Sequence, residues 1–252
     1  DDVMAEAQDG SGTCNANFAT PIEGNRPRMQ MYVCGNRDGD LDNAVIIHEY
    51  GHGISIRLTG GPFNSSCLNN QEQPGEGWSD WYGLMLTMRT GDAGPNSRGI
   101  GTWLFGQPPT GPGIRQYPYS TNLAVNPHTY DNIKTAAVPH GVGSVWCAML
   151  WEVTWDLIAQ YGFDPNFYTG NGGNNRALKL VTEALKLQPC SPGFVDARNA
   201  ILKADTVLYN AQNACLIWKA FAKRGLGYSA LQASSGSRSD GTQAFDIPPA
   251  CM

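Results

Sequence analysis

The sequence HEYGH at residues 48–52, followed by GEGWSD at residues 75–80, decides how this chain is expected to fold. His48 and His52 are four residues apart, so on a helix both imidazoles project from one face and can reach a single ion. The surrounding stretch, residues 44–58, is otherwise rich in apolar side chains. Burying imidazoles and a carboxylate there is costly without a metal or polar partners. We therefore expect a buried, metal-binding helix.

The remaining ligand of this site has to come from elsewhere in the chain. A catalytic zinc has three protein ligands and one open position. Position 58, where one class of HExxH proteins has a third histidine, is Leu58. That class is therefore excluded, and we predict a carboxylate from the next helix, namely Glu76. Glu72 is the competing ligand, but it lies in the preceding loop.

Two further acids have expected roles beside the metal. Glu49 follows the first ligand, so its carboxylate can reach a water at an open metal position without displacing it and can act as a general base. Asp80 follows Glu76 by four residues, which places both carboxylates on one helix face. Asp80 can therefore accept the distal N–H of a ligating histidine and fix its tautomer.

Composition excludes several classes of protein. The 252 residues have a net charge of −5 and an isoelectric point near 5.3, whereas a nucleic-acid binder normally carries a basic face. No apolar run reaches the roughly 18 residues that a membrane helix needs. The acidic run at residues 38–42 lacks the rest of a calcium loop, so we expect a turn and a cap from Asp42 or Asn43 there, and calcium is not expected. One zinc ion is the expected cofactor.

The seven cysteines are well separated and contain no CxxC pair, which favours disulfides in an oxidising compartment over a zinc knuckle. Their odd number leaves at least one thiol outside any pair within the chain. Cys190 and Cys215 bracket a helix-like stretch and are the expected pair. Asn64 opens the only N-x-S/T sequon, which fits a secreted protein.

The order of elements suggests an α+β fold with a β-rich start and a helical remainder. Residues 1–41 contain turns and one alternating stretch, residues 29–33, that predicts a strand. Residues 91–139 are rich in glycine and proline and are expected to be irregular. Helices are expected at about 44–58, 75–89, 141–161, 174–187, 192–208 and 212–224.

Several longer motifs resemble the fungalysins, secreted fungal metallopeptidases of the thermolysin-like gluzincin group. The similarity extends over essentially the whole chain. It is carried by HEYGHGIS at 48–55, RLTGGP at 57–62, GEGWSD at 75–80, AQDGSGT at 7–13, NANFATP at 15–21, RQYPYS at 115–120 and AFAKRGLG at 220–227.

The resemblance implies a role for each matching residue. His48, His52 and Glu76 match the zinc ligands, Glu49 the general base and Asp80 the acid behind a ligand. It further implies that His140 stabilises the transition state, that Arg115 holds a substrate carbonyl, and that Asn15 and Ala16 belong to an edge strand that pairs with the substrate backbone. Thermolysin-like sites also carry a tyrosine donor, and the sequence does not choose among Tyr117, Tyr119 and Tyr130. His128 is expected to be a loop residue.

The resemblance also implies a two-lobed, thermolysin-like fold. Residues 1–41 would then be the remnant of a β-rich N-terminal lobe, and residues 42–252 the mainly helical catalytic lobe. Family members carry a longer N-terminal β-rich stretch and a removable propeptide, which would be partners of this chain within one precursor.

The expected function is that of a secreted zinc endopeptidase that cleaves polypeptides with a zinc-activated water and favours bulky apolar residues on the primed side. The alternative is a catalytically incomplete fragment that binds zinc but needs the missing N-terminal segment. An aminopeptidase would need acidic groups to hold a free amine, and the sequence contains no such motif. Nucleic-acid partners and a membrane span are not expected.

Overall fold

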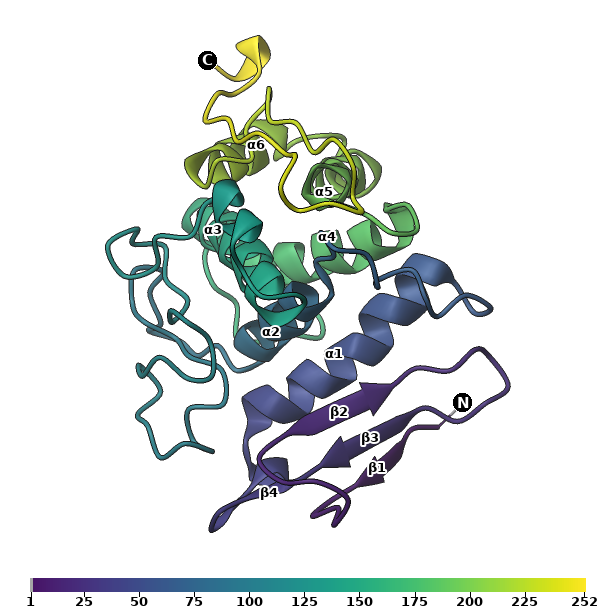
Figure 1. Ribbon diagram of the computed structural model, residues 1–252. Coiled ribbons are helices and arrows are strands. Elements are labelled where there is room, and N and C mark those ends of the chain that lie inside the picture. The colour runs from purple at the N-terminus through teal and green to yellow at the C-terminus, as the bar shows by residue number, and fades with distance from the viewer. Residues whose placement is uncertain (1) are drawn as a thin grey trace.

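The computed structural model describes residues 2–252. A small β-rich part is followed by six α-helices, and α1 lies between the sheet and the other helices (Figure 1). The strands are β1 (Met4–Glu6), β2 (Ala16–Ala19), β3 (Arg28–Met31), β4 (Val33–Cys34) and β5 (Arg37–Asp38). The helices are α1 (Asn43–Gly60), α2 (Gly75–Leu86), α3 (His140–Tyr161), α4 (Gly173–Leu187), α5 (Phe194–Tyr209) and α6 (Ala214–Lys223).

The α+β class and all six helices are therefore confirmed, with ends that shift by a few residues. The strand expected at residues 29–33 is divided at Tyr32 between β3 and β4, because β3 pairs with β1 and β2 while β4 forms a separate hairpin with β5. The division into parts at residues 41 and 42 stays a prediction.

The three-stranded sheet leaves β2 at an edge. Its order is β1-β3-β2, with β2 antiparallel to β3 and Ala16 opposite Met31. Phe18 of β2 and Met29 of β3 contribute to a small apolar cluster with Val45 of α1. The sheet thus packs on the helix that carries the HEYGH motif, and one edge of β2 has no strand partner within residues 2–252.

Helix α1 is anchored at both ends. Asp42 caps it, because its Oδ1 atom accepts bonds from the backbone nitrogens of Ala44 at 3.1 Å and Val45 at 3.4 Å. Its Oδ2 atom accepts a third bond from the Leu104 nitrogen at 3.1 Å, which ties the long loop to the helix start. The helix ends at Gly60, and the next residue, Gly61, caps it with a φ of 72° in the left-handed region.

Glycines bring α1, α2 and α3 unusually close together. A Cβ atom at Gly51 would lie 2.9 Å from the Cα of Ser79, and one at Gly77 would lie 2.3 Å from the carbonyl oxygen of Gly143. Real side chains do not tolerate these distances, so larger residues would push the helices apart. The close approach lets the histidines of α1 meet the carboxylates of α2.

The main core lies among the helices. Trp78 and Trp81 of α2 and Trp146 and Trp151 of α3 are fully buried. Both helices are apolar on most sides, as expected for helices that pack against neighbours all round. Packing of this kind gives α2, and with it Glu76 and Asp80, a rigid support.

The segment between α2 and α3 is irregular, as expected. Within it, one 3₁₀ turn spans Tyr130–Lys134, and Arg98 and Tyr119 form an isolated bridge. The segment returns to the α1–α2 pair through Arg115 and Tyr119, which contact Asp80. A long loop therefore forms one wall of the site.

Three disulfides link the cysteines, and the expected Cys190–Cys215 pair is wrong. Cys67 pairs with Cys190, Cys215 with Cys251, and Cys14 with Cys34. The physical reason is that Cys190 follows α4 and lies against the loop after α1, where the Ser191 nitrogen donates to the Cys67 carbonyl at 2.9 Å. Cys147 of α3 is free and buried. Among the described residues, no helix has the length and hydropathy to cross a bilayer.

Candidate metal centre

Three side chains from two helices converge on one point. The Nε2 atoms of His48 and His52 lie 3.1 Å apart, and Glu76 carboxylate oxygens lie 3.2 Å from the first and 3.6 Å from the second. All three side chains are largely buried. They form the one group of three or more His, Cys, Asp or Glu side chains with metal-ligand spacing in residues 2–252.

This donor set fits a zinc ion. Tetrahedral bonds of about 2.05 Å place neighbouring ligand atoms about 3.3 Å apart. The two imidazole nitrogens lie 3.1 Å apart, and one ligand atom from each of the three residues lies within 4.8 Å of the others. Two imidazoles and one carboxylate are also the ligand types of catalytic zinc sites with one open position. His48, His52 and Glu76 can therefore hold such an ion with little rearrangement.

Electrostatics distinguish the two imidazoles. Burial, and then the neighbouring His48, lower the pKa of His52 to about 4, which leaves it in the neutral form that ligates metals. Burial also acts to lower the pKa of His48, but Asp80 and Glu76 outweigh it and raise that pKa to about 10. A proton therefore balances the two carboxylates here, and a bound cation would take its place.

Asp80 lies behind the three candidate ligands. Its Oδ1 atom lies 2.7 Å from the Nδ1 atom of His48, on the side of the ring away from Glu76. Arg115 donates to the same carboxylate from Nε at 2.7 Å and from an Nη atom at 2.8 Å, and the Tyr119 hydroxyl donates a third bond. Burial opposes ionisation, but Arg115 and His48 hold the pKa of Asp80 well below its ordinary value.

Glu49 stands beside the ligands without joining them. It is buried, and it lines the same cavity as His48 and His52. Burial raises the pKa of its carboxyl to about 7, with His48 opposing the shift and Glu76 adding to it. A carboxyl with this pKa is suited to exchange protons near neutral pH.

A cavity of about 600 Å³ brings the expected substrate-binding residues to the ligands. Ala16 lines it from β2, Arg115 from the long loop, and His140 from the start of α3. Asn15 also lines it but precedes β2, and its carbonyl accepts a bond from the Tyr32 nitrogen at 3.2 Å, so its expected place in the edge strand is wrong. His140 is 63% exposed at its side chain, and its Nε2 atom lies 3.6 Å from a Glu76 oxygen. Apolar side chains of the wall include Phe18, Val45, Ile56, Ile100, Leu104, Phe105 and Ile114.

The structure also separates residues that the sequence left as alternatives. Glu72 lies outside the ligand cluster and accepts a bond from the Tyr130 hydroxyl. Tyr119 donates to Asp80, Tyr117 packs edge-on against His128, and Tyr130 donates to Glu72. None of these three candidate tyrosines lines the cavity that the described residues form. His128 is buried in the loop.

Two supporting contacts were not predicted from the sequence. One is the double bond of Arg115 to Asp80, since Arg115 was expected to face substrate alone. The other is the Tyr119 hydroxyl on the same carboxylate. No spacing rule reveals either contact, because both residues lie in irregular chain 35 and 39 positions after Asp80.

One helix carries an HExxH pair, and the helix opposite carries a glutamate followed four residues later by an aspartate. This arrangement is typical of the metal site of gluzincin-type metallopeptidases. A sequence model of that class, described as fungalysin metallopeptidase (M36), matches residues 1–230. The chain belongs to this family.

Several curated fungal proteins are similar over the whole chain. Extracellular metalloproteinase 2 of Arthroderma gypseum is 44% identical over 263 residues, which cover 100% of this chain and 40% of the relative. Extracellular metalloproteinase MEP of Neosartorya fischeri is 48% identical over 255 residues, 96% of this chain and 40% of the relative. Extracellular metalloproteinase 3 of Arthroderma otae is 46% identical over 263 residues, which cover 100% of this chain and 40% of the relative. The chain thus spans about 40% of the length of these relatives.

Proposed function

We propose that this chain is the catalytic part of an extracellular zinc endopeptidase. The single observation that carries the proposal is the convergence of His48, His52 and Glu76 at zinc-ligand spacing beside the buried Glu49. Family membership supports the metallopeptidase class. The names of the relatives and the three disulfides support an extracellular location.

A zinc ion held by the three ligands would polarise the scissile carbonyl and acidify a water at its open position. In the proposed mechanism, Glu49 accepts the proton of the attacking water and delivers it to the leaving amine. His140 donates from Nε2 to the oxygen on which negative charge develops. Asp80 keeps the His48 ring in one tautomer and orientation.

The substrate would bind in the cleft as an extended chain. The edge of β2 that has no strand partner among the described residues would pair with the substrate backbone at Ala16, a β-augmentation mode, and Asn15 lines the cavity directly before the strand. Arg115 faces the same cavity and can donate to a substrate carbonyl. Ile100, Leu104, Phe105 and Ile114 supply apolar wall, which supports a preference for bulky apolar residues on the primed side.

The test is Glu49→Gln in the zinc-loaded chain, assayed with a quenched peptide. Removing the base should lower kcat by about 10²–10⁴-fold, while zinc content stays at the parent level because Glu49 is not a ligand. Chelation should abolish cleavage, and added zinc should restore it. Cleavage that survives chelation would rule out the mechanism.

The second candidate is a zinc-binding fragment that lacks activity on its own. It is favoured by the share of the relatives' length, about 40%, that the chain covers. Full zinc occupancy in the parent chain without any peptide turnover would support the fragment. Turnover that disappears in Glu49→Gln would support the endopeptidase.

A further inference from the structure

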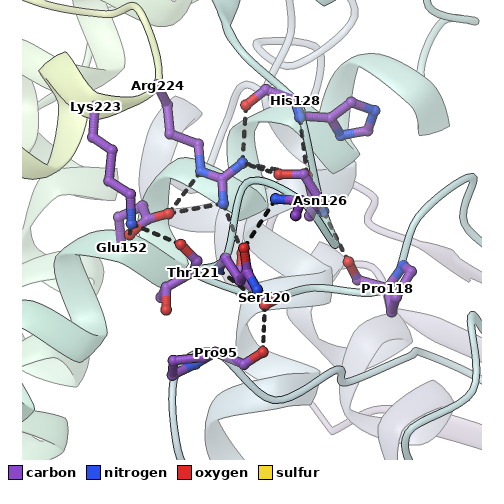
Figure 2. Close-up of polar contacts among 11 residues, drawn as sticks. Pro95, Pro118, Ser120, Thr121, Asn126, His128, Glu152, Lys223 and Arg224 are labelled. Carbon is purple, nitrogen blue, oxygen red and sulfur yellow. Dashed lines mark hydrogen bonds and ion pairs between the residues drawn. The ribbon is translucent and has the colours of Figure 1, made fainter.

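Arg224 is a fully buried arginine that follows the last residue of α6. One Nη atom donates to the carbonyls of Asn126 at 2.7 Å and His128 at 3.0 Å, and the other donates to the carbonyl of Ser120 at 2.6 Å. Figure 2 shows these bonds fanning out from one guanidinium to separate turns of the loop between α2 and α3. A single side chain therefore holds three loop carbonyls.

The charge of Arg224 is matched from the opposite side. Its Nε atom donates to Glu152 of α3 at 2.9 Å, and Lys223 donates to the other Glu152 oxygen at 2.7 Å (Figure 2). Lys223 also donates to the Thr121 carbonyl at 2.7 Å. The loop is thereby joined to α3 and α6 through charge-assisted bonds, which are among the stronger hydrogen bonds in proteins, and those of Arg224 are buried.

The clamped stretch leads directly to the metal centre. Asn126, whose carbonyl binds Arg224, donates its side-chain amide to the Pro118 carbonyl at 2.9 Å. Pro118 is next to Tyr119, whose hydroxyl donates to Asp80, and it lies three residues after Arg115. The covalent path from the clamp to two of the donors on Asp80 is therefore only a few residues long.

We propose that Arg224 is a positioning residue for the metal centre and the substrate cleft. By holding residues 118–128 against α3 and α6, it fixes where Arg115 and Tyr119 meet Asp80. The consequence for catalysis rests on the proposed function, whereas the consequence for the loop and for zinc affinity does not.

The acceptors around Arg224 fit the planar shape of a guanidinium group. Three carbonyls and one carboxylate surround a planar group whose donors point in fixed, divergent directions. A lysine ammonium presents its donors at a single point and cannot reach all four acceptors. Arg224→Lys should therefore behave like Arg224→Ala and not like the parent.

Arg198→Ala is the matched control. Arg198 is also buried, at 4% exposure, and it also donates to backbone carbonyls, those of Leu226 and Gly227. None of its bonds reaches the loop between α2 and α3. A difference between the two variants therefore reports the loop contacts and not the loss of a buried arginine.

The experiment compares the folded 252-residue chains by amide hydrogen exchange, zinc affinity and peptide kinetics. In Arg224→Ala, exchange should speed up at Tyr119 and Thr121, whose nitrogens donate to Arg98 and Gly94, while α4 keeps its protection. Zinc affinity should fall about tenfold through Asp80. The value of kcat/KM should fall about 10²-fold, as expected for a displaced substrate contact. Methylguanidinium at millimolar concentration should restore part of all three.

If Arg224→Ala does not fold, the double variant Arg224→Met with Glu152→Met replaces the ion pair by apolar side chains of similar size, an exchange that proteins commonly tolerate. It lacks the carbonyl contacts, so the same exchange and zinc changes should appear. A folded Arg224 variant that matches Arg198→Ala in loop exchange and zinc affinity would overturn the proposal. A parent chain without turnover would remove the proposed function, while the exchange and zinc measurements would still decide the role of Arg224.

Discussion

Arg115 and Asp80 form a bidentate ion pair next to the candidate metal ligands. The Nε and one Nη atom of the arginine lie 2.7 Å and 2.8 Å from the two carboxylate oxygens, and Asp80 is fully buried. The same Nη atom lies 3.2 Å from Glu76. Arg115 therefore contacts Glu76, a proposed ligand, and Asp80, the acid proposed to orient His48, in addition to lining the cavity.

Arg115→Lys should weaken zinc binding as well as substrate binding. A lysine cannot reproduce the fork, so Asp80 would be left partly unpaired in a buried site and the His48 ring would lose its fixed orientation. We expect zinc affinity about tenfold lower in a chelator competition. A higher KM with unchanged zinc affinity would mean that Arg115 serves the substrate alone.

Asp80→Asn should weaken zinc binding by about 10–100-fold, because an amide is a poorer partner for the imidazole of a ligand than a carboxylate is. Asp92→Asn is a suitable control, since Asp92 also pairs with an arginine, Arg98, but lies outside the ligand cluster. Zinc affinity measured for both variants at one pH checks this prediction. Equal affinities in the two variants would remove Asp80 from the support of the site.

Helical periodicity explains why the convergence of these side chains could be predicted from the sequence. His48 and His52, like Glu76 and Asp80, lie four residues apart, so each pair shares a face wherever its helix packs. The packing of α1 against α2 could not be predicted in the same way. The sequence contains Gly51, but only the structure reveals that it lies against Ser79 and allows α1 and α2 to touch.

The contacts of the irregular segments could not be predicted from the sequence. The loop between α2 and α3 is positioned by single long-range bonds, such as that from the Leu104 nitrogen to Asp42 and those from Arg224, and no local pattern encodes them. The prediction of the Cys190–Cys215 disulfide failed for the same reason. Cys190 follows one helix and Cys215 belongs to another, yet the partner of Cys190 is 123 residues away at Cys67.

Removing the Cys67–Cys190 disulfide should lower the free energy of unfolding by about 2–5 kcal/mol, because the bond closes a long loop and restricts the unfolded chain. Cys67→Ser with Cys190→Ser can be compared with the parent by denaturant titration of the zinc-loaded proteins. The matched pair, Cys215→Ser with Cys251→Ser, closes a shorter loop of 36 residues near the chain end and should cost less. An equal or larger loss in that second pair would contradict the loop-length argument.

Glu72 should make the fold less stable as pH rises. Its side chain is fully buried, and burial raises the pKa of the carboxyl from 4.5 to about 8, with the Tyr130 hydroxyl opposing the shift. Between these two values the folded chain keeps a proton that the unfolded chain releases. The free energy of unfolding should therefore fall by up to about 1.4 kcal/mol per pH unit across this window from Glu72 alone, and the loss should end above pH 8.

Glu72→Gln tests this dependence, because glutamine imitates the neutral acid and can still accept the Tyr130 bond. Denaturant titrations at pH 5, 7 and 8.5 should give similar stabilities for variant and parent at pH 5, and a growing advantage of the variant, up to a few kcal/mol, at higher pH. Glu183→Gln, on α4 in a pair with Lys186, should follow the parent curve. A difference between Glu72→Gln and the parent that is constant with pH would mean that Glu72 is ionised in the folded chain, because only a proton held by the native state makes that difference grow.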